Sequence, residues 1–124
     1  MLNLQNLALA HVDRLETIDA RLRKTISEQD PNWKLIYVRL RQDLQLELVA
    51  MAGLERSLAA AGHGEARLFA EAYRDLRAIS TQHDSRWPVV SIDYDNPDYV
   101  ASADLYRGAI AKLIEVGRRV AGRS

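Results

Sequence analysis

The sequence predicts an all-α protein, an antiparallel four-helix bundle formed by one domain that spans residues 1–124. Four segments repeat apolar residues at steps of three and four, which is the period of an amphipathic helix. Proline or glycine stands between these segments, where helices begin or end. The composition, 48% hydrophobic and 27% charged, is typical of a globular domain rather than of a disordered chain.

The first helix is predicted at about residues 3–28. Its apolar stripe runs through Leu4, Leu7, His11, Leu15, Ile18, Leu22 and Ile26. Because the steps stay close to the helical period, the stripe remains on one face, and Asp13, Glu16 and Arg21 fall outside it. We therefore expect this segment to pack one face against a core.

The second helix is predicted at about residues 31–61. Asp30 is expected to cap the first amides, and Pro31 fits the first helical position, where no amide hydrogen bond is lost. The main stripe is Trp33, Tyr37, Leu40, Leu44, Leu48, Met51, Leu54 and Leu58, and a shorter second stripe is Leu35, Val38, Leu46 and Val49. Two stripes predict a helix with a central position or with a second partner.

The third helix is predicted at about residues 65–84 and the fourth at about 97–121. Gly62 is expected to end the second helix, and the short turn that follows makes helices two and three antiparallel neighbours. Asn96-Pro97 repeats the start signal of the second helix. The third seam is Phe69, Ala72, Leu76, Ile79 and His83, and the fourth is Tyr99, Ala103, Tyr106, Ile110, Leu113, Gly117 and Val120.

The second helix is longer than its neighbours. It would span about 45 Å, against about 35 Å for the first and fourth helices and about 30 Å for the third. Either it bends near Gly53, or one end extends beyond the bundle and exposes Trp33, Leu35 and Val38. An exposed apolar patch of this kind usually marks an association surface, so a homodimer through the second helix is predicted.

A long extended loop, residues 85–97, is predicted between the third and fourth helices. It combines Trp87 and Tyr94 with the acidic Asp93 and Asp95, a mixture that favours partner binding. The alternative is a lid, in which Val90 and Ile92 close the end of the bundle. Both hold if the apolar side of the loop faces inward and Tyr94 with its acids faces outward.

His11 and His83 are the candidates for a metal or cofactor site, because both fall on apolar seams and would meet if the first and third helices were neighbours. A metal site in a bundle needs further carboxylates, usually with a Glu-x-x-His pattern, which is missing here. We therefore expect each histidine to hydrogen-bond a neighbour, and we predict no cofactor. The absence of cysteine excludes thiolate ligands and disulfides.

Arg77 is followed six residues later by His83, a spacing that resembles the arginine–histidine motif of HEPN ribonucleases, which are also helical bundles. The resemblance covers residues 77–83. It implies His83 as general acid–base and Arg77 as the group that stabilises charge on the phosphate. Ala78 stands where the motif favours a polar residue. This ribonuclease is the enzymatic alternative.

The balance of 17 basic and 17 acidic residues argues against nucleic acid as the partner. No segment predicts a signal peptide or a membrane span, so a cytoplasmic location is expected. Arginine outnumbers lysine 14 to three, which is typical of a GC-rich bacterial or phage genome. Without a catalytic motif, the sequence favours a protein-binding module, an adaptor, chaperone-like or regulatory protein. The alternatives are the ribonuclease and a ligand- or metal-binding bundle.

Overall fold

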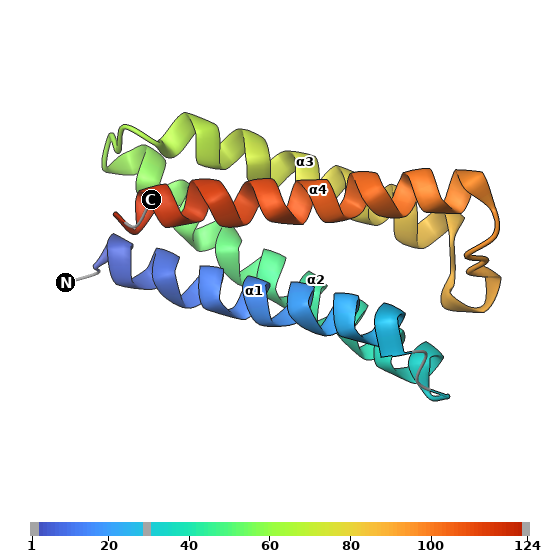
Figure 1. Ribbon diagram of the computed structural model, residues 1–124. Helices are drawn as coiled ribbons and strands as arrows, with labels where there is room; N and C mark the ends of the chain where they lie inside the picture. Colours follow the sequence, from blue (N-terminus) through green and yellow to red (C-terminus); the bar gives the residue numbers. More distant parts are fainter. Residues whose placement is uncertain (1–2, 29–30, 123–124) are drawn as a thin grey trace.

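The computed structural model describes residues 3–28 and 31–122, which form four helices that pack against one another (Figure 1). The elements are α1 (Leu4–Glu28), α2 (Trp33–Ala60), α3 (Ala66–Arg86), the 3₁₀ turn η1 (Val89–Ser91) and α4 (Pro97–Val120). Within the described ranges there is no strand. The prediction of an all-α fold is confirmed, and each helix lies within two residues of its predicted bounds.

Each helix packs against two others: α1 and α3 both contact α2 and α4. The start of α1 and the end of α4 lie at one end of the molecule, and the α3–α4 connection lies at the other (Figure 1). Toward that second end, the α1–α2 pair diverges from the α3–α4 pair. The predicted seams supply most of the core, whose most completely buried large side chains include Leu15, Leu40, Leu44, Leu58, Phe69, Leu76, Ile110 and Leu113. Tyr73, which lies on no predicted seam, is buried with them.

The two predicted proline starts behave differently. At α4, the Asn96 side chain accepts a hydrogen bond of 2.9 Å from the Asp98 amide, and Pro97 takes the first helical position, as predicted. The α2 prediction is wrong, because this helix begins at Trp33 and Pro31 lies in the turn before it. Asp30, the predicted cap of α2, lies outside the described residues.

The end of α2 follows the predicted glycine signal. Gly62 has a positive φ of 64°, a backbone conformation that a side chain would strain. Its amide donates to the Ala59 carbonyl, and the His63 amide donates to the Leu58 carbonyl, both at 3.1 Å. These two bonds are the Schellman arrangement, which satisfies carbonyls at the helix end and turns the chain into α3.

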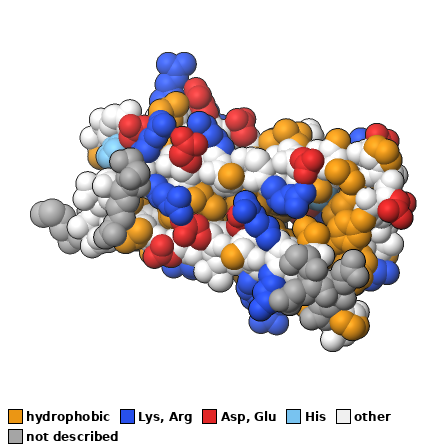
Figure 2. Space-filling model, viewed as in Figure 1, with side chains coloured by type: hydrophobic (Ala, Val, Ile, Leu, Met, Phe, Trp, Pro, Cys, Tyr) orange, Lys and Arg blue, Asp and Glu red, His pale blue; other side chains and the backbone are white. Residues whose placement is uncertain are grey.

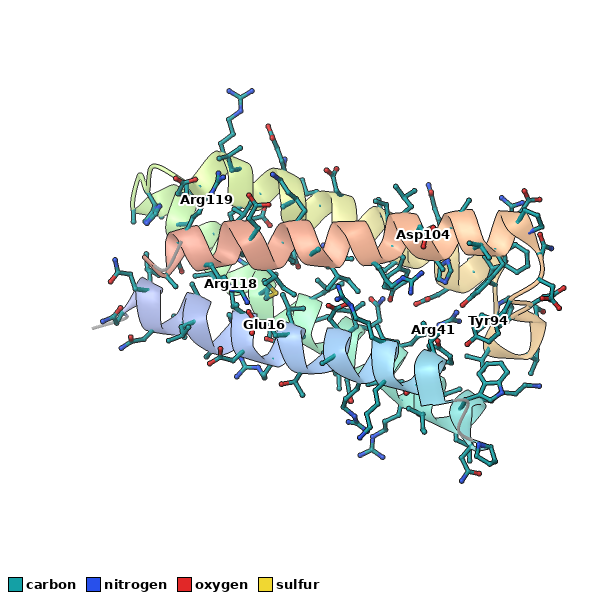
Figure 3. The ribbon with its side chains drawn as sticks, in the orientation of Figure 1. Glu16, Arg41, Tyr94, Asp104, Arg118 and Arg119 are labelled. Carbon is teal, nitrogen blue, oxygen red and sulfur yellow. The ribbon has the colours of Figure 1, made fainter. Side chains whose placement is uncertain are left out.

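A close approach between α1 and α4 holds together the end of the bundle where α1 begins. A Cβ atom built on Gly117 would lie only 2.6 Å from Cγ2 of Val12, so the absence of a side chain at residue 117 lets the helices meet. Beside this contact, Arg118 of α4 forms an ion pair with Glu16 of α1, and the two side chains point toward each other (Figure 3).

The start of α2 is covered on one side by the α3–α4 connection, while Leu35 and Val38 stay exposed, as predicted. α3 runs on to Arg86, two residues beyond its predicted end, so the connection to α4 spans residues 87–96 and contains η1. η1 packs against α2. Trp33 at the start of α2 contacts Tyr94 of the connection, with ring centroids 5.8 Å apart. Trp33 is therefore half-buried instead of fully exposed on an overhang.

Candidate interaction surfaces

One face of α2 is apolar and exposed. Leu35, Val38, Leu46 and Val49 are 72%, 42%, 69% and 74% exposed, and these four residues are called the α2 face below. They form the shorter of the two predicted stripes. The longer stripe is buried in the core from Tyr37 to Leu58. The helix therefore presents apolar side chains to the bundle on one side and to solvent on the other.

Charged residues flank the α2 face. Arg39 is exposed and Asp43 half-buried, and both line a surface hollow between α1 and α2 together with Arg21 and Leu35. Among the residues that the structure describes, neither Arg39 nor Asp43 has an ion-pair partner. The α2 face is thus bordered by a cation and an anion that have no ion-pair partner in the described part of the chain; they lie four residues apart and hence on the same side of the helix.

A buried polar cluster joins α1 to α2 near this face. His11 Nδ1 lies 2.5 Å from one oxygen of Glu47, and Arg14 Nε donates to the other oxygen at 2.8 Å. His11 and Glu47 are 6% and 7% exposed. The Glu47 carboxylate gives the buried His11 side chain a hydrogen-bond partner, as predicted for a histidine on an apolar seam. Glu47 was missed in the sequence, although its spacing of three residues from the buried Leu44 places it on the core side of the helix.

At the diverging end, aromatic rings fill the space between the helix pairs. The chain has eight aromatic residues, and six of them join one ring network with His83: Trp33, Tyr37, Trp87, Tyr94, Tyr99 and Tyr106. These seven residues are called the aromatic cluster. Figure 2 shows hydrophobic side chains gathered at this end, with charged side chains spread over the rest of the face.

The ring geometry of the cluster is favourable. Edge-to-face contacts join Trp33 to Tyr37 at 5.6 Å, Tyr94 to Tyr99 at 5.6 Å, and Trp87 to Tyr99 at 5.4 Å between centroids. Such pairs stabilise a fold by about 0.5–1.5 kcal/mol beyond the area that they bury. The connection is therefore held to both α2 and α4 by aromatic contacts.

Tyrosine hydroxyls link the connection to α2. The Tyr94 hydroxyl donates to the Tyr37 hydroxyl at 3.0 Å, which fixes the connection above the start of α2 (Figure 3). Burial raises the pKa of Tyr37, and the hydrogen bond with Tyr94 raises it further. Burial also raises the pKa of Tyr99 and of Tyr106. These hydroxyls stay protonated at neutral pH, so none of them acts as a base there.

His83 is the one histidine of the aromatic cluster. Its side chain packs edge-on against Tyr106, and Nδ1 lies 2.7 Å from the Ser102 hydroxyl. Burial lowers the pKa of His83 to about 4, and the positive charge of Arg41 adds to this effect. Arg41 forms an ion pair with Asp84, with Nε 3.2 Å from Oδ1. Burial raises the pKa of Asp84, which the Arg41 charge opposes.

A small cavity lies beside His83, lined by residues of all four helices that include Leu22, Tyr37, His83 and Tyr106. Its volume is about 40 Å³. A cavity that holds benzene in a protein interior has about 150 Å³, and one water needs about 10–15 Å³. The space can therefore take about three to four waters, and an organic ligand would enter only if the helices moved apart.

No protein-family model, curated protein or solved structure matches this chain.

Within the ranges described, no helix is both long and apolar enough to cross a bilayer.

The structure brings some of the predicted site residues together. Trp33, Trp87 and Tyr94 converge in the aromatic cluster, although Trp87 Nε1 is buried without a hydrogen-bond partner in the described part of the chain. Asp93 and Asp95 are exposed, and Asp93 Oδ1 accepts from the Asp95 amide at 3.0 Å, which stabilises the turn before α4.

The connection has the features of a lid only in part. Val90 is 81% exposed and does not close the end of the bundle, whereas Ile92 is half-buried. The rings of Trp87 and Tyr94 cover the helix ends instead. The apolar closure comes from aromatic residues that the sequence suggested as partner-binding groups.

The histidines do not come together with the groups proposed beside them. His11 contacts Glu47 of α2, while His83 contacts Ser102 of α4. Arg77 is exposed with its guanidinium 5.8 Å from the Tyr73 ring centroid, whereas His83 is buried. In the described residues no group of three or more metal-ligating side chains is found.

Proposed function

We propose that this antiparallel four-helix bundle is a non-enzymatic protein–protein interaction module that binds its partner through the α2 face. The observation that carries the proposal is the exposure of four large aliphatic side chains in line on one helix. Isolated exposed leucines are ordinary, but four aliphatic side chains aligned on one face of an otherwise well-packed helix usually mark a contact surface. An adaptor, chaperone-like or regulatory role fits such a surface.

The apolar surface of the α2 face is large enough for its burial against a partner to offset the cost of association. Complete burial of a valine or leucine side chain stabilises by about 1.5–3 kcal/mol, so these partly exposed residues would each contribute about 1–2 kcal/mol. A partner that buries an equal apolar surface doubles the sum to about 8–16 kcal/mol. Association costs about 4–15 kcal/mol, so micromolar binding is within reach when the surfaces match.

We place the α3–α4 connection second as a contact region. Trp87 and Tyr94 are largely engaged with Tyr99 and Tyr37, so their rings have less free surface than the α2 face. Asp93, Asp95 and part of Tyr94 remain available to the same partner at the edge of the bundle. The energy of binding is expected to come mainly from the aliphatic residues of α2.

The proposal is tested by a photo-crosslinking amino acid placed at residue 46 in cells of the native host. Gln82, which is exposed on α3 and polar, provides the matched control position. We expect protein adducts at residue 46 that are missing at residue 82, and we expect Val49→Asp to remove them by inserting a charge into the contact. Equal adducts at both positions, or none at residue 46, would overturn the proposal.

A further inference from the structure

The α2 face is symmetric along the helix. Leu35 and Val49 stand seven residues on either side of Gln42, and Val38 and Leu46 stand four residues on either side. Gln42 is itself exposed and lies in the middle of the stripe. The pattern of leucine, valine, glutamine, leucine and valine therefore presents an aliphatic side chain at equal distances in both directions from one polar centre.

Such a stripe is complementary to itself when two helices run in opposite directions. In a contact with two-fold symmetry, each residue meets a residue equally far from the axis on the other copy, and every contact occurs twice. With the axis at Gln42, Leu35 meets Val49 of the second copy, and Val38 meets Leu46. Gln42 meets its own equivalent, and its amide can both donate and accept a hydrogen bond there.

We propose that the partner of the α2 face is a second copy of this chain, paired antiparallel through α2 with the two-fold axis at Gln42. This inference rests on the proposed function, because it uses the same face. It adds the identity of the partner, the direction of the helices and their register.

The charges at the edge of the face favour the antiparallel direction. Arg39 lies three residues before the axis and Asp43 one residue after it, on the same side of the helix. In the antiparallel pair, Arg39 of one copy and Asp43 of the second copy lie about 3 Å apart along the helix axis, a distance that an arginine side chain spans. Two symmetric ion pairs result. In a parallel pair the two-fold axis would run along the helices and place the Arg39–Asp43 edges of the two copies on opposite sides of the contact, so neither ion pair would form.

Unpaired charges inside one chain fit this arrangement. Arg39 and Asp43 have no ion-pair partner among the described residues of the chain, so their pairing with a second copy breaks no existing contact. A bilayer surface is a poorer occupant, because Gln42 and Asp43 would enter an apolar layer or face anionic lipid headgroups. An unrelated partner would give no reason for the symmetry about Gln42.

Single cysteines test the register, because the chain has no cysteine of its own. Gln42→Cys alone should form a disulfide-linked dimer in mild oxidant, since the axis brings the two thiols together. Leu35→Cys and Val49→Cys should each stay mainly monomeric when alone and should cross-link at least tenfold more when mixed. Gln82→Cys on α3 is the control. Efficient self-linking of Leu35→Cys and of Val49→Cys would show a parallel pair and overturn the proposal.

A charge exchange tests the edge contacts without touching the core. Light scattering at about 10–100 µM should give the mass of two chains for the unchanged protein. Arg39→Glu and Asp43→Arg should each weaken the dimer at least tenfold, because like charges then meet across the axis. The double variant should recover dimer formation. Equal weakening in the double variant, or a one-chain mass at all concentrations, would contradict the proposal.

These results separate the inference from the function on which it rests. If the purified chain stays monomeric while residue 46 still cross-links a different protein in the host, the proposed dimer is wrong and the proposed protein–protein interaction function is supported. If the purified chain is monomeric and residue 46 gives no specific adduct, both fail. An adduct with twice the mass of the chain, together with cross-linking of Gln42→Cys, supports both.

Discussion

His83 should make the fold sensitive to mild acid. Burial is the main cause that lowers the pKa of His83 to about 4, and the charge of Arg41 is the second. The imidazole is 6% exposed and lies between Ser102 and the ring of Tyr106. A charge on this ring would be placed beside the Arg41 guanidinium and against apolar surface. The neutral form is therefore the one that the folded chain holds.

The two pKa values of His83, in the folded and the unfolded chain, decide whether acid raises or lowers the free energy of unfolding. The unfolded chain takes up a proton on His83 near pH 6.5, and the folded chain does so only near pH 4. The contribution of His83 to the free energy of unfolding is therefore complete above about pH 6.5 and is lost as the pH falls toward about 4. With about 1.4 kcal/mol for each pKa unit, the loss is about 2 kcal/mol at pH 5 and about 3 kcal/mol at pH 4.

Asp84 works in the opposite direction. Burial raises the pKa of its carboxyl group, so the folded chain binds this proton more readily than the unfolded chain does. Its contribution to stability is present at low pH and is lost as the pH rises through the folded pKa. Protonation of Asp84 also removes the anion that pairs with Arg41. The pKa shift of Asp84 therefore offsets part of the loss of about 3 kcal/mol that His83 contributes at pH 4.

The assay is urea unfolding between pH 7.5 and pH 4.5, with the free energy of unfolding compared at each pH. His83→Gln should be less stable at pH 7, because it loses the ring contacts, but its stability should fall much less on acidification. His63→Gln is the control, since His63 lies in the α2–α3 turn. Full acid dependence in His83→Gln, or an NMR titration that places the pKa of His83 near 6.5, would refute this role of His83.

Three further substitutions should change the free energy of unfolding, each measured by urea denaturation. Gly117→Ala should destabilise by about 1 kcal/mol, because overlap with Val12 outweighs the gain in helix propensity, whereas Gly108→Ala, with open space around it, should stabilise by about 0.5–1 kcal/mol. Glu47→Ala should cost about 3 kcal/mol, since it leaves a buried histidine without its carboxylate. Tyr73→Phe should cost about 1 kcal/mol through the lost hydrogen bond to a carbonyl of α2. Equal effects for the two glycine substitutions would contradict the close approach of α1 and α4.

The helices were predictable because their signals are local. The apolar period places the core residues of each helix, and the amide side chain of Asn96 caps α4 within two residues of its own position. The same signal, a cap residue followed by proline, predicted the wrong start for α2, because this helix begins two residues after Pro31. The residue at which a helix begins also depends on how the chain must turn so that neighbouring helices pack, and a local sequence signal does not contain that information.

The exposed face of α2 was also visible in the sequence as a second stripe. The second stripe shows that the helix has two apolar faces, but the packing of the helices decides which face enters the core. The contacts of His83 and His11 were not predictable in this way. Ser102 and Glu47 lie 19 and 36 residues away from them, so these pairs exist only once the register of the helices is known.

Likewise, Trp33 and Tyr94 are 61 positions apart in the chain, and only the fold of the α3–α4 connection brings their rings into contact. The loop composition suggested recognition because exposed aromatic residues favour binding. The structure uses most of that aromatic surface to close the diverging end of the bundle.

The position of the aromatic cluster has a practical consequence for spectroscopy. Both tryptophans of the chain, Trp33 and Trp87, belong to it, so intrinsic fluorescence reports on one end of the molecule only. Far-ultraviolet circular dichroism averages over all four helices. If fluorescence changes at a lower urea concentration than the dichroism does, the connection and the start of α2 come apart while the end held by Gly117 remains helical. Coincident curves would mean that the two ends unfold as one cooperative unit.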